Sequence, residues 1–234
     1  MGLTTTAVPI IMTNSHIMNT GHYKKTERRK NEQLARRTAI VKAAREVFFA
    51  KGFKSATVDE IADRCGLAKG TIYLYFKSKE ELYMSVMAEG MQRLRKEFEV
   101  LKKRPPGSKE FVESAFMAYY HFFKRNRKYF RIMFLSSQPD MRSRVPEEAL
   151  RGCMEAGREC LGIVRDLVQE GIDARCYRQV DAWAVANILW ATINGIIMAY
   201  EQDPIYREEI VGMELEQMLL KSLDLALEGL RLKK

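Results

Sequence analysis

The chain has 234 residues, of which 47% are apolar and 29% are charged, and its formal net charge is +9 at neutral pH. This composition is that of a globular protein with a sizeable core, and it excludes an intrinsically disordered chain. No run of 18 apolar residues occurs, so we expect no membrane-spanning helix and no membrane partner.

The positive charge is concentrated near the N-terminus. Residues 24–81 carry 15 Lys and Arg against 8 Asp and Glu, whereas residues 82–234 carry 24 against 22. A basic excess confined to one part of the chain predicts a polyanionic partner that binds at one end of the molecule.

Two segments of different composition precede the first apolar repeat. Residues 1–23 contain no Lys, Arg, Asp or Glu and lack the basic start of a signal peptide, so we expect a disordered tail. The basic arm that follows, residues 24–37, has two interpretations. It is either a solvated helix surface or a segment that contacts DNA phosphates or a minor groove. Its cations are Lys24, Lys25, Arg28, Arg29, Lys30, Arg36 and Arg37.

Helix ends are predicted by local signals in the next stretch. Apolar residues recur every three or four positions from Ile40, which predicts a helix, and Gly52 stands where a left-handed cap would end it. Thr57 followed three residues later by Glu60 is a capping box, which predicts the start of a second helix. Gly66 is expected to end that second helix.

A very short third helix is predicted over residues 69–75, and Ser78 is expected to cap a fourth. Two short helices joined by a Gly-containing turn form a helix-turn-helix, here residues 57–76, whose second helix lies in the DNA major groove. The structural alternative is a solvated three-helix bundle with ordinary surface tyrosines. The candidate DNA contacts are Lys69, Gly70, Thr71, Tyr73 and Tyr75.

Residues 57–62 and 66–82, within the stretch 40–82, resemble the DNA-binding domain of the TetR family of bacterial regulators. The resemblance implies that the five candidate residues contact DNA and that Lys79 holds a phosphate at the start of the fourth helix. It also implies that Thr57 is a phosphate contact. A position that can contact a base in this family falls on Asp59, which we assign only as a charge at the helix start, because an acid cannot bind phosphate.

The fourth helix is predicted to be long, roughly 25 residues, and to end before Pro105. In the TetR family such a helix connects the DNA-binding domain to the rest. We therefore expect a DNA-binding domain over residues 24–82 and a larger helical effector-binding and dimerisation domain over residues 83–234. We hypothesise that this helix transmits the ligand state.

Residues 108–135 are unusually rich in aromatic side chains. A hydrophobic core accounts for such a pattern without further function. The alternative is an apolar ligand cavity with few polar groups, which the resemblance favours because the family binds its effector in this region. The candidate lining residues are Phe116, Tyr119, Tyr120, Phe123, Phe130, Met133 and Phe134. The candidate polar anchors are Tyr119, Tyr120, His121 and Arg131.

Three more helices are predicted, over residues 147–171, 180–198 and 213–230. No charge occurs between Ala182 and Ala199, so that helix must be covered on all sides, in part by a partner. Two helices from each of two subunits form a dimer interface in the TetR family, and a twofold DNA site requires a dimer. The candidate interface residues are Trp190, Ile193, Ile197, Met218, Leu219, Leu223 and Leu227.

Catalytic and metal-binding signals are weak. Four cysteines form no CxxC pair, so we expect reduced, mostly buried thiols in a cytoplasmic protein, with a thiol-based sensor as the alternative. Hydrolase, zinc-enzyme and nucleotide-binding motifs are not found, and His121 is the only histidine beyond the tail. We therefore predict no catalytic residue, no metal and no cofactor.

These observations predict an all-α protein with an N-terminal helix-turn-helix domain. It would be a homodimeric transcriptional repressor that leaves a palindromic operator when a small, largely apolar ligand binds. Two alternatives stay open: a helical scaffold that binds only protein, and a transcriptional activator without a small-molecule effector. The scaffold would leave the basic segment and the pair Tyr73 and Tyr75 without a purpose.

Overall fold

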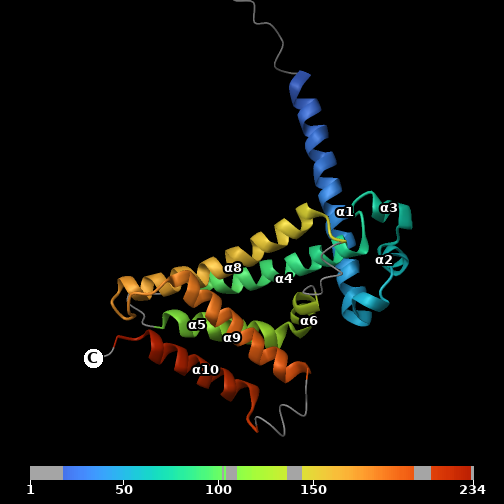
Figure 1. Cartoon of the computed structure of the whole chain (residues 1–234). Helices are drawn as coiled ribbons and strands as arrows, with labels where there is room; N and C mark the ends of the chain where they lie inside the picture. The colour runs from blue at the N-terminus through green and yellow to red at the C-terminus, as the bar shows by residue number, and fades with distance from the viewer. Residues whose placement is uncertain (1–17, 102, 104–109, 136–143, 203–211, 233–234) are drawn as a thin grey trace, which may run out of the picture.

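The computed structural model describes residues 18–101, 103, 110–135, 144–202 and 212–232 (Figure 1). Within these ranges the fold is all-α, as predicted. The helices are α1 (Met18–Ser55), α2 (Val58–Cys65), α3 (Lys69–Tyr73), α4 (Lys79–Leu101), α5 (Phe111–Arg125), α6 (Arg127–Leu135), α8 (Glu147–Asp173), α9 (Ala182–Gln202) and α10 (Leu215–Leu230). Figure 1 shows α2 and α3 beside α1 at one end of the molecule and α10 at the opposite end.

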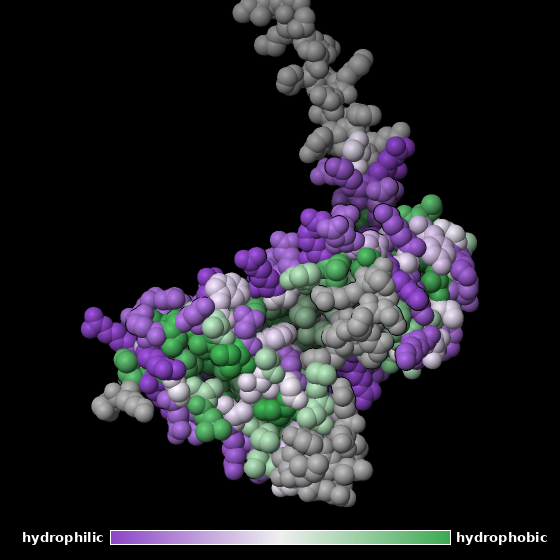
Figure 2. All heavy atoms as spheres, viewed as in Figure 1, coloured by the Kyte–Doolittle hydropathy of each residue, from purple (hydrophilic) through white to green (hydrophobic). Residues whose placement is uncertain are grey.

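The first helix starts earlier than predicted. It begins at Met18, so residues 18–23, which we assigned to a disordered tail, are helical, and the rest of that tail lies outside the described residues. Side chains 26–36 are all exposed, and this part of α1 projects from the body as a hydrophilic rod (Figures 1 and 2). The basic arm is therefore helical where the structure describes it.

The predicted cap and glycine signals act on the N-terminal helices, with one difference. Gly52, predicted to end the first helix, has a left-handed φ of 73° and kinks α1, which continues to Ser55. The Thr57 hydroxyl accepts a hydrogen bond from the backbone N of Glu60 at 3.3 Å, and the Glu60 carboxylate accepts one from the backbone N of Thr57 at 3.1 Å. Gly66 ends α2 with a φ of 65°. These local features hold α2 and α3 at the angle of a helix-turn-helix.

Two hydrophobic cores are formed by this arrangement. The N-terminal core joins α1, α2, α3 and the first part of α4 around residues such as the fully buried Ile72. The C-terminal core joins the end of α4 with α5, α8, α9 and α10. Helix α6 belongs to both, because Tyr129, Ile132 and Met133 pack in the N-terminal core while Phe130 packs in the C-terminal core. The N-terminal core thus extends beyond residue 82.

Helices α4 and α6 are in close contact. The buried hydroxyl of Tyr83 donates a hydrogen bond to the backbone O of Ile132 at 3.1 Å. Gly90 lets the helices approach, because a Cβ at this position would lie 2.9 Å from the Cδ1 atom of Tyr129. The helix that follows the helix-turn-helix is therefore fixed to α6 at two points.

Helix α9 carries the charge-free segment. Its residues 182–201 are long and apolar enough to cross a membrane by length and composition alone, a test that a core helix of a globular protein also passes. The helix packs against α8 and α10, yet only 39% of that window is buried. Its exposed face carries Ala184, Ile188, Ala191 and Gly195, without any charge.

Most of the predicted dimer-interface residues are buried within their own subunit. Trp190 and Met218 are half-buried, and the other five residues are at most 5% exposed inside their own subunit. The five buried residues are Ile193, Ile197, Leu219, Leu223 and Leu227. A side chain buried in the core of one subunit cannot contact another subunit, so these five assignments are corrected.

Candidate nucleic-acid interface and effector pocket

Helix α3 and the turn after it bring the five predicted DNA contacts together. Lys69 and Gly70 are exposed, Tyr73 is 45% exposed, and Thr71 and Tyr75 are half-buried. A single buried isoleucine anchors this short helix to the N-terminal core. The result is a surface that offers a cation, a hydroxyl and two phenols, all of which can form hydrogen bonds with DNA.

Leu74 was missed by the sequence analysis. It is 82% exposed, the highest exposure among the large apolar side chains that the structure describes, and it follows Tyr73 at the end of α3. An exposed apolar side chain beside phenols can pack against a thymine methyl group. Its exposure could have been inferred from its position between two tyrosines. The helix that it follows is too short to bury apolar residues on both sides.

An ion pair joins the first turns of α2 and α3. The Nζ atom of Lys69 lies 2.8 Å from a carboxylate oxygen of Asp59, and this contact raises the pKa of Lys69. Both side chains are at least half exposed, so the pair adds little stability. Asp59, assigned from the sequence only as a charge at the helix start, therefore also neutralises the first cation of α3.

Lys79 makes contacts within the protein that the sequence did not suggest. Its Nζ atom donates hydrogen bonds to the backbone O atoms of Phe53 and Ala56, at 2.9 and 3.0 Å, and lies 4.4 Å from the centre of the Phe53 ring. Ser78 caps the same helix as predicted, accepting a hydrogen bond from the backbone N of Glu81 at 3.1 Å. Lys79 thus joins α4 to the turn between α1 and α2.

The last cation of the basic arm is also structural. Arg37 donates a hydrogen bond from Nη1 to the backbone O of Tyr75 at 2.8 Å, and its guanidinium lies 4.1 Å from the centre of the Phe76 ring. By contrast, Arg29 and Arg36 are exposed and make no hydrogen bond or ion pair within the described residues. Arg37 therefore fixes the direction in which the projecting part of α1 leaves the body.

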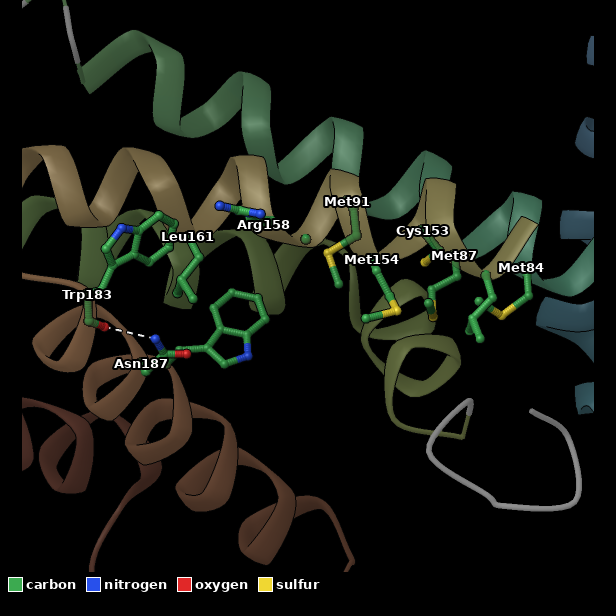
Figure 3. A pocket seen from close by; sticks show the side chains of 12 residues that line it. Met84, Met87, Met91, Cys153, Met154, Arg158, Leu161, Trp183 and Asn187 are labelled. Atoms are coloured by element: carbon green, nitrogen blue, oxygen red, sulfur yellow. Dashed lines mark hydrogen bonds between the residues drawn. The ribbon is translucent and has the colours of Figure 1, made fainter. Parts of the chain in front are cut away.

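A large open pocket lies between α4, α8 and α9. Its volume is about 820 Å³, within the range of small-molecule sites. Figure 3 shows four methionines and Cys153 toward one end, with Arg158, Trp183 and Asn187 toward the other. The lining residues are Met84, Met87, Met91, Leu150, Cys153, Met154, Gly157, Arg158, Leu161, Trp183, Asn187 and Trp190.

The two ends of this pocket differ in chemistry. Thioether side chains are flexible and polarisable, so they adapt to apolar ligands of irregular shape. At the other end the exposed Arg158 guanidinium lies 5.9 Å from the centre of the Trp183 ring, and the Asn187 amide donates to the backbone O of Trp183 at 2.8 Å. The pocket therefore suits an apolar chain with an anionic or polar head.

None of the seven predicted ligand-pocket residues lines this space. Phe116 and Tyr119 border a separate void of only about 20 Å³, which holds no ligand larger than water. Tyr120, Phe123 and Phe130 are buried in the C-terminal core. Met133 packs in the N-terminal core, and the side chain of Phe134 lies outside the described residues. The aromatic segment is mainly core, so the predicted lining is corrected.

The predicted polar anchors are occupied elsewhere or lie outside the pocket. The Tyr119 hydroxyl donates to the side-chain oxygen of Asn194, and burial raises its pKa. Tyr120 donates to the Glu216 carboxylate at 3.0 Å. Arg131 lies 3.7 Å from Glu201, and His121 is exposed. Arg158 and Asn187 take the place of these anchors in the candidate pocket.

Thiol chemistry has little support. Burial raises the pKa of Cys153 to about 11 and that of Cys160 to about 12, so both thiols are protonated at neutral pH. Among the described residues, no group of three or more His, Cys, Asp and Glu side chains is placed to hold a metal ion.

Comparison with known proteins identifies the helix-turn-helix. A family model described as "Bacterial regulatory proteins, tetR family" matches residues 40–86. The chain is 30% identical to the Fatty acid metabolism regulator protein of Bacillus subtilis over 146 residues, which cover 60% of this chain and 75% of that protein. It is 28% identical over 156 residues to the HTH-type transcriptional activator FasR of Mycolicibacterium smegmatis, covering 64% and 68% of the two chains.

Solved structures share the fold over most of the chain. The transcriptional regulator FadR of Bacillus subtilis, in complex with stearoyl-CoA, superimposes with a TM-score of 0.63 at 23% identity, covering 82% of this chain and 98% of that one. The TetR family transcriptional regulator PfmR of Thermus thermophilus has a TM-score of 0.61 at 21% identity, with coverages of 83% and 99%.

Proposed function

This chain belongs to the tetR family of bacterial regulatory proteins, and from that premise we propose that it is a cytoplasmic homodimeric repressor released from its operator by an apolar ligand. The observation that carries the proposal is that α4 takes part in both sites. Its first residue, Lys79, is hydrogen-bonded to Phe53 and Ala56, which directly precede the helix-turn-helix, and Met84, Met87 and Met91 line the pocket. A ligand between α4, α8 and α9 therefore acts on the helix that holds the DNA-binding motif.

In the DNA complex, α3 lies in the major groove. Lys69 exchanges Asp59 for a phosphate, while Thr71, Tyr73 and Leu74 meet base edges. The Thr57 hydroxyl accepts a hydrogen bond in its cap, so its proton is free to donate to a phosphate.

The division of roles on α3 can be tested by substitution. Tyr73→Ala should reduce discrimination between a selected duplex and a random one. Lys69→Ala should weaken binding to both duplexes to a similar extent. Equal losses on both duplexes for the two variants would contradict this division.

The exposed apolar face of α9 is the proposed dimer interface. Because this face has no charge, covering it with the same face of a second copy removes apolar area from water without burying an ion pair. The α9 helices of the two subunits then pack together in one helix bundle. This bundle places the two copies of α3 on one DNA duplex.

Matched substitutions test this interface. Ile188→Asp should convert the dimer into a monomer in analytical ultracentrifugation. Val100→Asp on α4 is the control, because Val100 is 64% exposed and Ile188 is 61% exposed. A monomeric wild type, or an Ile188→Asp variant that stays dimeric, would contradict the proposal.

The ligand is proposed to be a long-chain acyl compound. The pocket supports this class, because its methionine end suits a flexible chain and Arg158 stands at the polar end. The names of two similar proteins, the Fatty acid metabolism regulator protein and FadR with stearoyl-CoA, point in the same direction. A chain bound against Met84 and Met87 would shift α4 relative to α6, to which it is tied by the Tyr83 hydrogen bond.

Release from DNA is the test of this ligand. A long-chain acyl-CoA should dissociate the protein from a selected duplex, whereas a short-chain acyl-CoA at equal concentration should not. Arg158→Gln should raise the concentration needed for release about tenfold, as expected for one charge-assisted contact. Arg151→Gln on the exposed side of the same helix should not change it. Release by both chain lengths, or by neither, would contradict the proposal.

One relative favours a second candidate, because FasR is named as a transcriptional activator. The same architecture would then raise transcription when bound to DNA. A reporter gene behind the selected operator distinguishes the two, since deletion of a repressor increases expression and deletion of an activator decreases it.

A further inference from the structure

The base of the projecting part of α1 lies beside Tyr75, which follows the recognition helix. An open groove of about 680 Å³ lies between them, lined by Arg29, Glu32, Gln33, Ala35 and Arg36 of α1 and by Tyr75. Side chains from one stripe of α1 therefore share a groove with a residue that we assign to DNA contact.

The charges of this stripe are available to a partner. Arg29 and Arg36 are exposed and have no hydrogen-bond or ion-pair partner within the described residues. Glu32 is the single acid among the groove residues, and Arg28 neutralises it in an exposed pair of 3.1 Å. Such a pair is weak, so a phosphate can displace Glu32 from Arg28 at low cost.

The direction of the stripe is fixed before any partner binds. Arg37 holds the backbone O of Tyr75 and stacks on Phe76, so the base of the arm is joined to the end of the recognition segment. From Arg36 to Arg29 the helix rises about 10 Å, so the two guanidinium groups can contact different phosphates of one DNA strand.

We infer that the stripe formed by Arg28, Arg29 and Arg36 binds the sugar-phosphate backbone of DNA outside the base pairs that α3 contacts. The groove beside Tyr75 receives the backbone of a DNA strand that borders the major groove in which α3 lies. The arm thereby lengthens the bound site on both sides of the dimer and adds affinity without sequence preference. This inference rests on the proposed function, because it needs α3 to be seated on DNA.

The test compares two lengths of one duplex, selected by the wild-type protein from a random pool. One length is trimmed to the base pairs that α3 protects, and the other carries about eight extra base pairs of arbitrary sequence on each side. The variant is Arg28→Gln, Arg29→Gln and Arg36→Gln together, because Gln and Arg have similar helix propensity. The control removes three exposed cations elsewhere: Lys103→Gln, Arg178→Gln and Lys221→Gln.

Wild type and control should bind the long duplex about tenfold more tightly than the trimmed one, and the arm variant should bind both equally. The slope of log affinity against log salt on the long duplex should fall by about 2 to 3 for each arm lost. Equal binding of both lengths by the wild type, or a flank effect retained by the arm variant, would overturn the inference. If the wild type binds no duplex, the proposed function itself fails, which is a distinguishable result.

Discussion

Lys79→Ala separates a structural role from a DNA-binding role at one residue. The Lys79 ammonium donates two hydrogen bonds to backbone carbonyls and lies over the Phe53 ring. Hydrogen bonds from a charged donor contribute about 1.5–3 kcal/mol each when buried, and the cation–π contact adds about 0.5 kcal/mol at a partly exposed site. Because Lys79 is half-buried, we discount these values and expect a loss of about 2 kcal/mol.

Chemical denaturation of wild type and variant measures this loss directly, and the melting temperature should fall by about 4–8 °C for a chain of this size. Lys77→Ala is the matched control. It removes the same charge two residues earlier, but the Lys77 side chain is exposed and has no partner within the described residues. We expect Lys77→Ala to leave the free energy of unfolding within about 0.5 kcal/mol of wild type.

DNA binding then decides what else Lys79 does. If Lys79 acts only within the protein, folded Lys79→Ala keeps the wild-type salt dependence of binding, whereas loss of a phosphate contact lowers that slope by about 0.9 for each subunit. A variant as stable as wild type would refute the structural reasoning, since both carbonyl contacts would then contribute nothing.

Three further outcomes are expected. Asp59→Asn should bring the pKa of Lys69 back to its ordinary value and tighten binding to any duplex about two- to fivefold, as fluorescence anisotropy will show; weaker binding would contradict this. Cys160, whose pKa burial raises to about 12, should resist a thiol reagent at pH 8 while half-buried Cys176 reacts; early labelling of Cys160 in mass spectra would disprove the packing. Gly171→Ala should lower the free energy of unfolding by about 1–2 kcal/mol, because the new Cβ would lie 2.3 Å from a tyrosine ring and the gain in helix propensity offsets only part of the clash; an unchanged denaturation midpoint would count against it.

The elements that could be predicted from the sequence are those whose signals are local. A cap such as Thr57 with Glu60 involves residues three positions apart, and the left-handed Gly52 acts on its own backbone. The helix-turn-helix is a run of such signals, which is why the start of α2 at Thr57 and its end at Gly66 were predicted correctly. The intramolecular contacts of Lys79 could not be predicted, because the carbonyls of Phe53 and Ala56 are brought to it only by the kink in α1.

The pocket could not be predicted in the same way. Its walls come from three helices, and methionines such as Met87 and Met91 repeat at helical spacing as ordinary core residues do. Whether apolar side chains meet or leave a space depends on how helices cross, which a one-dimensional pattern does not contain. The same limit explains Ile193 and Leu223: their stripe was recognised as buried, but the sequence did not say by which subunit.

Because α6 packs in both hydrophobic cores, it limits how the two parts of the protein can be exchanged in engineering. A chimera that joins this helix-turn-helix to the sensor half of another regulator would place a foreign α6 against Phe49 and Tyr83, where Tyr129 and Ile132 now fit. A chimera that exchanges α1 to α4 together with the α6 residues of the N-terminal core would keep this packing intact. Transfer of this helix-turn-helix to another regulator therefore requires Tyr129, Ile132 and Met133 as well, although they lie far downstream in the gene.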